Sequence, residues 1–185
     1  MQLMPDNPAL DLNRLREMHP RLPPDVAESI KSRAALGLQR NQHSTGVNLH
    51  MAIDSDASSC PLLWSAANLD EAEVHDHNRI TEDGAEAIAL AVAHRTKTWQ
   101  VVRRGQSKHK ERGDWVLEHV SDGKRRRIVL EVSGVDRGSI SARVREKLAQ
   151  VAKSPIHVFD RCAAVVGFER PEASLKTVKK KAYGR

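Results

Sequence analysis

Two carboxylates stand inside apolar stretches of the sequence. Asp114 precedes the apolar run 115–117, and Glu131 interrupts the apolar run 128–132. A carboxylate that is buried without a partner carries a large free-energy penalty, so each of these needs a cation, a hydrogen-bond donor or a position at a sheet edge. Two carboxylates that converge are the ligands that a hard divalent cation such as Mg²⁺ takes in proteins. The pair is therefore a candidate metal site.

A tight hairpin is expected to bring these two carboxylates together. Segments 113–120 and 127–134 are rich in residues that favour strands, and Ser-Asp-Gly-Lys at 121–124 joins them. Asp-Gly between two such runs is a strong hairpin signal. Because the strands of a hairpin are antiparallel, the start of the first lies beside the end of the second, where Asp114 and Glu131 stand. The alternative is two edge carboxylates that pair with nearby arginines.

The composition is that of a chain long enough for one domain with an aliphatic core. Of its 185 residues 39% are hydrophobic and 3% aromatic, and the formal net charge is +6. This charge favours an anionic partner such as nucleic acid. Cys60 and Cys162 form no CxxC pattern, which excludes a disulfide framework and a zinc knuckle. Without a long apolar run or a signal-like N-terminal segment, we expect a cytoplasmic protein with no membrane partner.

Prolines, periodicity and charge divide the chain into four parts. Residues 1–45 contain five prolines and are expected to be an N-terminal extension that is partly helical or disordered. Residues 46–72 are expected to form a β-hairpin appendage, since 47–53 alternates cleanly between apolar and polar residues. The core domain is expected at 78–170, followed by a basic tail at 171–185.

Within the core domain, helices and strands follow one another in a definite order. Acidic residues begin a helix at 81–94, which carries a stripe of alanine, isoleucine and valine. A strand at 99–103 and the hairpin follow, and then a helix at 140–153 and a buried strand at 162–168. The expected order is helix, strand, strand, strand, helix, strand.

This order, with an acid on each strand of the hairpin, resembles the core of the PD-(D/E)XK, or restriction-endonuclease-like, nuclease superfamily over roughly residues 80–168. The resemblance implies an α/β fold with a mixed sheet flanked by helices. It also implies hydrolysis of DNA phosphodiesters with Mg²⁺ or Mn²⁺. Asp114 matches the first metal-binding acid of the family and Glu131 the acid of its E-x-K element. Glu86 fits the helix-borne acid that some branches add to the metal site.

The sequence departs from the family at the lysine of this element, where it has Ser133. Ser133 shares strand parity with Glu131, but a hydroxyl is no cation and a poor base. On the next helix, Lys147 falls about 20° from Ile140, inside the apolar stripe, with Gln150 at its flank. Relocated lysines and a glutamine on this helix occur in branches of the superfamily. The alternatives are that Lys147 is a counter-ion of Glu131 or a surface lysine that snorkels.

Basic residues gather on either side of the first acidic strand. Such side chains bind phosphates with an affinity that depends on salt and not on sequence. The alternative is a solvated hairpin that discourages edge pairing. The candidate nucleic-acid-binding residues are Arg104, Lys108, Lys110 and Arg112 before the strand, and Lys124, Arg125 and Arg126 at the hairpin tip.

Three functions are compatible with these patterns. The first is a metal-dependent nuclease that acts on DNA, with a homodimer as one expected arrangement, since many enzymes of the resembling fold pair up to cut two strands. The second is a catalytically inactive protein of the same fold that binds nucleic acid or acts as an adaptor. The third is an unrelated α/β interaction module in which Asp114 and Glu131 are ordinary ion-pair partners.

Overall fold

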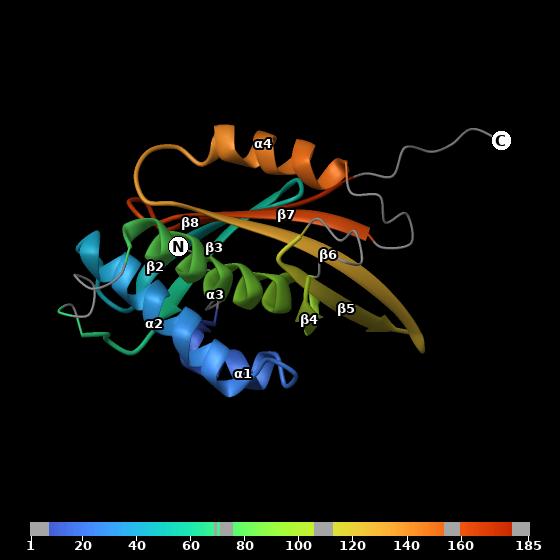
Figure 1. Cartoon of the computed structure of the whole chain (residues 1–185), viewed down its shortest axis with the longest axis horizontal. Helices are drawn as coiled ribbons and strands as arrows, with labels where there is room; N and C mark the ends of the chain where they lie inside the picture. Colours follow the sequence, from blue (N-terminus) through green and yellow to red (C-terminus); the bar gives the residue numbers. More distant parts are fainter. Residues whose placement is uncertain (1–7, 69, 71–75, 106–112, 154–159, 179–185) are drawn as a thin grey trace, which may run out of the picture.

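The computed structural model describes residues 8–68, 70, 76–105, 113–153 and 160–178, and the chain forms an α/β fold (Figure 1). The helices in these ranges are η1 (Leu12–Arg14), α1 (Leu15–Met18), α2 (Pro24–Arg40), α3 (His77–Lys97) and α4 (Ser141–Ala152). The strands are β1 (Leu10–Asp11), β2 (Val47–Ile53), β3 (Asp56–Leu63), β4 (Gln100–Arg104), β5 (Trp115–Ser121), β6 (Lys124–Val135), β7 (Asp160–Gly167) and β8 (Glu172–Thr177). No helix among the described residues is long and apolar enough to cross a membrane.

All strands belong to one mixed, eight-stranded sheet with the order β1-β3-β2-β8-β7-β6-β5-β4. Helices cover both faces: α3 and α2 lie on one side, and α4 lies on the other (Figure 1). Strands β4, β5 and β6 form an antiparallel meander. β7 then returns parallel to β6 after the α4 crossover. The mixed sheet flanked by helices that the sequence predicts is confirmed at this level of description.

The hairpin between β5 and β6 forms where the sequence predicts it. Ser121 pairs with Lys124, and the two residues between them, Asp122 and Gly123, have φ angles of 50° and 71°. Positive φ at both central residues is the requirement of a type I′ turn, whose twist matches that of the flanking strands. The Asp-Gly pair therefore determines the register that places Asp114 beside residues 130–132 of β6.

Helix α3 is the central helix and is packed on two sides. Its first turn is capped by Asp76, whose side chain accepts a hydrogen bond from Asn78 N at 2.9 Å. A Cβ at Gly84 would lie 2.9 Å from the backbone of Arg33 on α2, and a Cβ at Gly134 of β6 would collide with the carbonyl oxygen of Thr81. These two glycines let α3 approach both α2 and the sheet, which explains why its alanine-rich surface is buried almost all round.

Residues 8–63 contribute to the same hydrophobic core as the later helices and strands. Leu12, Leu15 and Leu22 are each at most 1% exposed, and α2 packs along α3. β2 matches the predicted strand 47–53, and it lies inside the sheet between β3 and β8. The segment that the sequence suggests is an appendage is thus continuous with the main sheet.

A strand that was not predicted completes the sheet. Residues 172–177, in the range expected to be a basic tail, form β8 between β7 and β2. Ala173 and Leu175 face the core, being 3% and 1% exposed. Lys176 and Thr177 at its end give the segment a polar character, so hydrophobic periodicity alone does not reveal the strand.

Candidate functional site

Asp114 lies at the base of the hairpin, immediately before β5. Its backbone N–H donates to Leu130 O at 2.9 Å, which continues the ladder between the strands by one residue. Its side-chain Oδ2 accepts a hydrogen bond from Val132 N at 2.7 Å. β6 extends past the start of β5, so the Val132 N–H faces no strand on that side. The carboxylate takes the place of a missing backbone acceptor.

Glu82 also supplies a side-chain acceptor to β6, two residues further along the strand. Its Oε2 accepts from Gly134 N at 3.1 Å, and its Oε1 accepts from the Ser133 hydroxyl at 3.2 Å. Sequence reasoning did not select Glu82. The signal was its position one helical turn before Glu86, on the same face of α3. Ser133, at the family's lysine position, is 0% exposed and its hydroxyl is committed to Glu82.

Glu131 points to the opposite face of the sheet, toward α4. The side chain is buried, and its Oε1 accepts hydrogen bonds from Lys147 Nζ at 2.7 Å and from Gln150 Nε2 at 2.8 Å. Lys147 is itself well covered, with 16% of its side chain exposed. The structure therefore brings together the three residues that helix periodicity and strand position selected. This contact also agrees with the counter-ion alternative for Lys147.

Glu86 reaches the site from α3 and is 7% exposed. Its Oε1 accepts from Arg104 Nη1 at 2.8 Å. Its Oε2 is buried and has no hydrogen-bond partner within the described ranges. The Arg104 guanidinium lies 4.2 Å from the centre of the Trp115 ring, a cation–π contact that holds the arginine over β5. Arg104, expected to contact phosphate, is here the counter-ion of Glu86.

Asp114 and Glu86 both have raised pKa values. Burial raises the pKa of Asp114 to about 6, the negative charge of Glu131 adds to this, and the Val132 N–H, Lys147 and Arg104 oppose it. Burial also raises the pKa of Glu86, against the lowering effect of Arg104, and Asp114 raises that pKa further. Both pKa values are raised mainly because burial disfavours a charged carboxylate, a cost that a bound cation would offset.

Glu86, Asp114 and Glu131 have the ligand atoms that a divalent cation prefers, but their present positions are not those of a metal site. Carboxylate oxygens are what Mg²⁺ and Mn²⁺ take. The Oε2 of Glu86 is a buried carboxylate oxygen, and the Trp115 side chain helps to lower the pKa of Glu86. Among the described residues, however, no group of three or more histidine, cysteine, aspartate and glutamate side chains is close enough together to hold a metal ion. Coordination by all three acids would require Glu131 or Glu86 to exchange its present ion pair for the metal.

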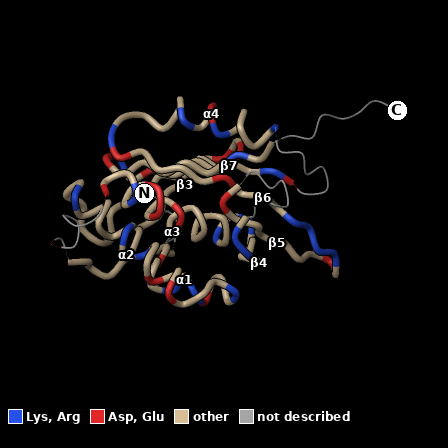
Figure 2. Tube along the Cα trace, viewed as in Figure 1, with Lys and Arg blue, Asp and Glu red and all other residues tan. Residues whose placement is uncertain are grey.

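The hairpin tip carries a second charged cluster. Lys124, Arg125 and Arg126 are exposed there, and Figure 2 shows the run of positive charge along this end of β6. Glu118 on β5 lies beneath it at 7% exposure, within 3.1 Å of Arg21, 3.6 Å of Arg125 and 3.9 Å of Arg127. Arg21 and Arg127 were not among the predicted residues. Lys108, Lys110 and Arg112 lie outside the described residues.

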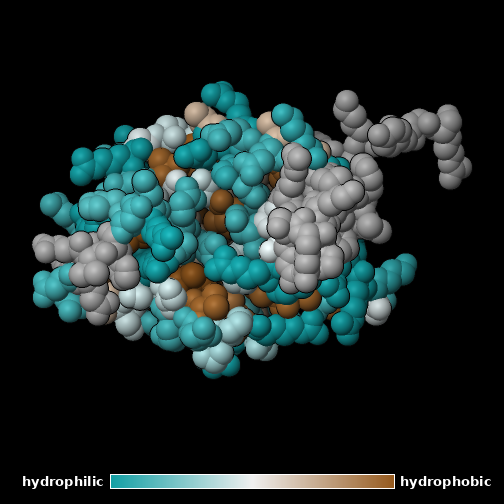
Figure 3. Space-filling view, in the orientation of Figure 1, coloured by the Kyte–Doolittle hydropathy of each residue, from teal (hydrophilic) through white to brown (hydrophobic). Residues whose placement is uncertain are grey.

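The face of the molecule in the orientation of Figure 1 is predominantly polar. The face in Figure 3 is mostly hydrophilic, with apolar residues visible in small groups. Val120, beside the hairpin turn, is 57% exposed; no other large hydrophobic side chain among the described residues is classed as exposed.

No protein-family model, no curated protein and no solved structure matches this chain. The function is therefore argued from the arrangement of the sheet and from the chemistry of the acid cluster, Glu86, Asp114 and Glu131.

Proposed function

We propose that this protein is a metal-dependent nuclease that hydrolyses phosphodiester bonds, with DNA as its substrate. The observation that carries the proposal is the electrostatic coupling of Asp114 with Glu131 and Glu86, together with Lys147 bonded to Glu131. Asp114 stands where β5 begins and β6 continues alone, with Glu131 next to it on β6. Glu86 approaches from α3, and Lys147 is bonded to Glu131 from α4. The order α3-β4-β5-β6-α4-β7, with β7 parallel to β6, supports the resemblance to the PD-(D/E)XK core.

Each residue has a distinct role in this proposal. Asp114 and Glu131 would hold Mg²⁺ or Mn²⁺, and Glu86 would contribute a further oxygen. When bound, the ion lowers the pKa of a water and offsets charge on the scissile phosphate. Lys147 places its ammonium beside the acids, in the role that the resemblance gives to the strand lysine, and Gln150 orients Glu131 through its 2.8 Å hydrogen bond.

The cationic role is assigned to Lys147 and not to Ser133. The Ser133 hydroxyl donates to Glu82 and is fully buried. Lys147 reaches the site from α4 and retains 16% side-chain exposure, so its ammonium has access to an entering phosphate. The homodimer and the cytoplasmic location expected from the sequence stay predictions.

A second candidate function is nucleic-acid binding without catalysis. The observation that favours it is that Glu131 and Glu86 already form ion pairs with Lys147 and Arg104, at 2.7 Å and 2.8 Å. A pair of this kind balances a buried carboxylate without any metal. The basic hairpin tip would serve this function equally well.

Cleavage assays with and without metal separate the two candidates. We expect the wild type to cut plasmid or single-stranded DNA in Mg²⁺ or Mn²⁺ and not in EDTA. Asp114→Ala and Glu131→Ala should each lower the rate by about 100-fold or more, since the metal contributes several kcal/mol of transition-state stabilisation. Glu146→Ala is the matched control, because Glu146 lies next to Lys147 and its side chain is 59% exposed.

Two results would decide against the nuclease. Cleavage that survives both Asp114→Ala and Glu131→Ala would refute the assigned site. Salt-sensitive DNA binding by the wild type, without cleavage in either metal, would favour the non-catalytic function.

A further inference from the structure

Glu118 of β5 is a buried carboxylate that is surrounded by more arginines than it needs. Its Oε1 lies 3.1 Å from Arg21 Nη1, and its Oε2 lies 3.6 Å from Arg125 Nη1 and 3.9 Å from Arg127 Nε. One arginine is enough to balance the charge of one buried carboxylate. These four residues, the Glu118 cluster, therefore carry positive charge in excess of what their own ion pairing requires.

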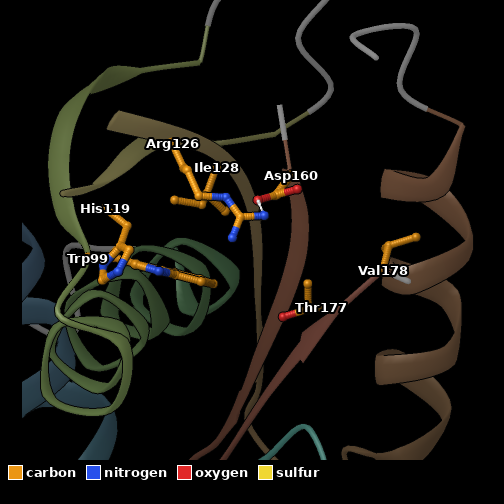
Figure 4. A pocket seen from close by; sticks show the side chains of 7 residues that line it. All are labelled: Trp99, His119, Arg126, Ile128, Asp160, Thr177 and Val178. Carbon is orange, nitrogen blue, oxygen red and sulfur yellow. Dashed lines mark ion pairs between the residues drawn. The ribbon is translucent and has the colours of Figure 1, made fainter. Parts of the chain in front are cut away.

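The opposite face of the hairpin pairs its arginine one to one. Arg126 stands between Arg125 and Arg127 on β6, so its side chain leaves the strand on the other face. There its Nη2 lies 3.0 Å from Asp160 Oδ2, beside the hollow shown in Figure 4. The two faces of one strand thus differ, and the excess of positive charge lies on the face of Glu118.

The arginines of the Glu118 cluster are accessible to solvent. Their side chains are 52% exposed for Arg21, 63% for Arg125 and 36% for Arg127. Within the described ranges the Oε2 of Glu118 has no hydrogen-bond partner, so Arg125 and Arg127 lie near it without donating to it. A planar guanidinium binds phosphate oxygens through two parallel hydrogen bonds. The cluster therefore presents donors that suit a phosphate.

Buried neighbours on either side fix the backbone of Arg21. His19 is 0% exposed, and its ring nitrogens lie 3.1 Å from Leu90 O and 3.2 Å from Val101 N. Leu22 is 1% exposed, and its N–H donates to His19 O at 2.9 Å, which closes a tight turn around Arg21. A side chain presented from a rigid turn loses less conformational freedom when it binds a ligand.

The Glu118 cluster leaves the hairpin on the same side as the acid cluster. Asp114 and Glu118 are four residues apart, or about 13 Å along the strand, and side chains at even spacing share a face. Arg127, which pairs with Glu118 in the ladder, is likewise four residues from Glu131. The phosphates of one DNA strand are about 3.4 Å apart along the helix axis, so about four nucleotides span this distance.

We propose that Arg21, Arg125 and Arg127 bind one phosphate of the DNA backbone, about four nucleotides from the bond that the acid cluster cleaves. Glu118 holds the three guanidinium groups together against their mutual repulsion. The inference rests on the proposed function and deepens it, because it identifies a second contact point for the substrate. It also assigns a part in substrate binding to the N-terminal segment, through Arg21.

The test measures DNA binding in EDTA, where no metal supports cleavage. The probe is a duplex of about 16 base pairs, which at 3.4 Å per base pair is longer than the hairpin. Arg21→Gln should weaken binding about fivefold at about 0.1 M salt, and should lower the slope of log affinity against log salt concentration by about 1. Arg21→Lys should keep the slope, because it keeps the charge.

A second substitution tests whether the arginines share one phosphate. Arg125→Gln alone should act like Arg21→Gln. The double variant should weaken binding by less than the product of the two single effects, because both side chains hold the same ligand. Arg14→Gln is the matched control. Arg14 is 64% exposed on the same N-terminal segment and pairs with Glu17 at 2.7 Å, so its removal should leave the affinity and the slope unchanged.

An unchanged slope for Arg21→Gln would overturn the inference, because an arginine that only balances Glu118 affects stability and not salt dependence. A double variant whose effect equals the product of the single effects would overturn the shared phosphate. Asp114→Ala separates this question from the nuclease, since it should abolish cleavage and preserve the effect of Arg21→Gln on binding. An effect of Arg21→Gln without any cleavage by the wild type would refute the proposed function alone. Cleavage with an unchanged slope would refute this inference alone.

Discussion

The two ends of the β5–β6 hairpin hold buried carboxylates with opposite charge balance. Among the described residues, the base brings Glu82, Glu86, Asp114 and Glu131 near Arg104 and Lys147. From the middle of the hairpin toward its tip, the described residues place one buried carboxylate, Glu118, near the three cations Arg21, Arg125 and Arg127. One hairpin thus presents an acid excess at one end and a base excess at the other.

The difference indicates which ligand each end favours. At the base, the pKa of Asp114 is raised to about 6 because burial and Glu131 disfavour its negative charge, so a bound cation relieves that cost. At the tip, one carboxylate orients three arginines and leaves positive charge in excess, which favours a phosphate. A metal ion at the base and a phosphodiester chain at the tip would satisfy both.

The largest expected change in stability is at the base. Lys147→Met leaves the carboxylate of Glu131 buried with Gln150 as its remaining donor, and we expect a loss of about 3 kcal/mol in the free energy of unfolding. Urea denaturation measures it. The double variant Glu131→Gln with Lys147→Met should recover most of the loss, because it removes both charges.

Arg143→Ala is the control for this measurement. Arg143 is on the same helix and forms an exposed pair with Glu146 at 2.9 Å, so its removal should cost less than about 0.5 kcal/mol. If Lys147→Met is no more destabilising than Arg143→Ala, the base is not a buried ion-pair site.

The next largest effect is an increase in the free energy of unfolding. Asp114→Asn removes a charge that the fold disfavours and keeps an oxygen for the Val132 N–H, so we expect about 2 kcal/mol more stability at pH 7.5. The folded pKa, about 6, lies above the ordinary value of 3.8. Wild-type stability therefore rises, relative to the variant, as pH falls through 6 toward 4, and the gap should close. A gap that is constant from pH 7.5 to 4 would contradict this account.

The equivalent change at the tip should have the opposite sign. Glu118→Gln removes the carboxylate that three arginines share. We expect the free energy of unfolding to fall by only about 1 kcal/mol at pH 7.5, because solvent screens the exposed arginines. Thermal or urea unfolding of this variant beside Asp114→Asn tests the comparison directly. Two stabilising or two destabilising substitutions would refute the contrast between the ends.

The smallest effect on stability is expected for the arginines of the tip. Arg125→Ala should change the free energy of unfolding by less than about 0.5 kcal/mol, because Glu118 keeps Arg21 and Arg127. It should nevertheless lower the slope of log affinity for DNA against log salt concentration by about 1. Arg14→Ala, an exposed residue paired with Glu17 on the N-terminal segment, should leave that slope unchanged.

Local sequence patterns predicted much of the β5–β6 hairpin and of helix α4. The Asp-Gly turn predicted the register of β5 and β6, because residues adjacent in sequence determine a two-residue turn. Helix periodicity placed Lys147 on the covered side of α4, where it meets Glu131. Strand parity did not predict the partner of Ser133, because Glu82 enters beside the open edge of β6 and not from a face of the sheet.

The sequence by itself determined the hairpin, the two acids on its strands and the helix that carries Lys147, since each depends on residues close along the chain. The tertiary structure alone decided that β8 inserts between β7 and β2, and that Arg21 reaches Glu118 from the N-terminal segment. It also decided that Glu82 and Asp114 supply acceptors for the free N–H groups of β6. Some of these contacts join residues more than a hundred positions apart in the sequence. They depend on which surfaces pack together when the core forms.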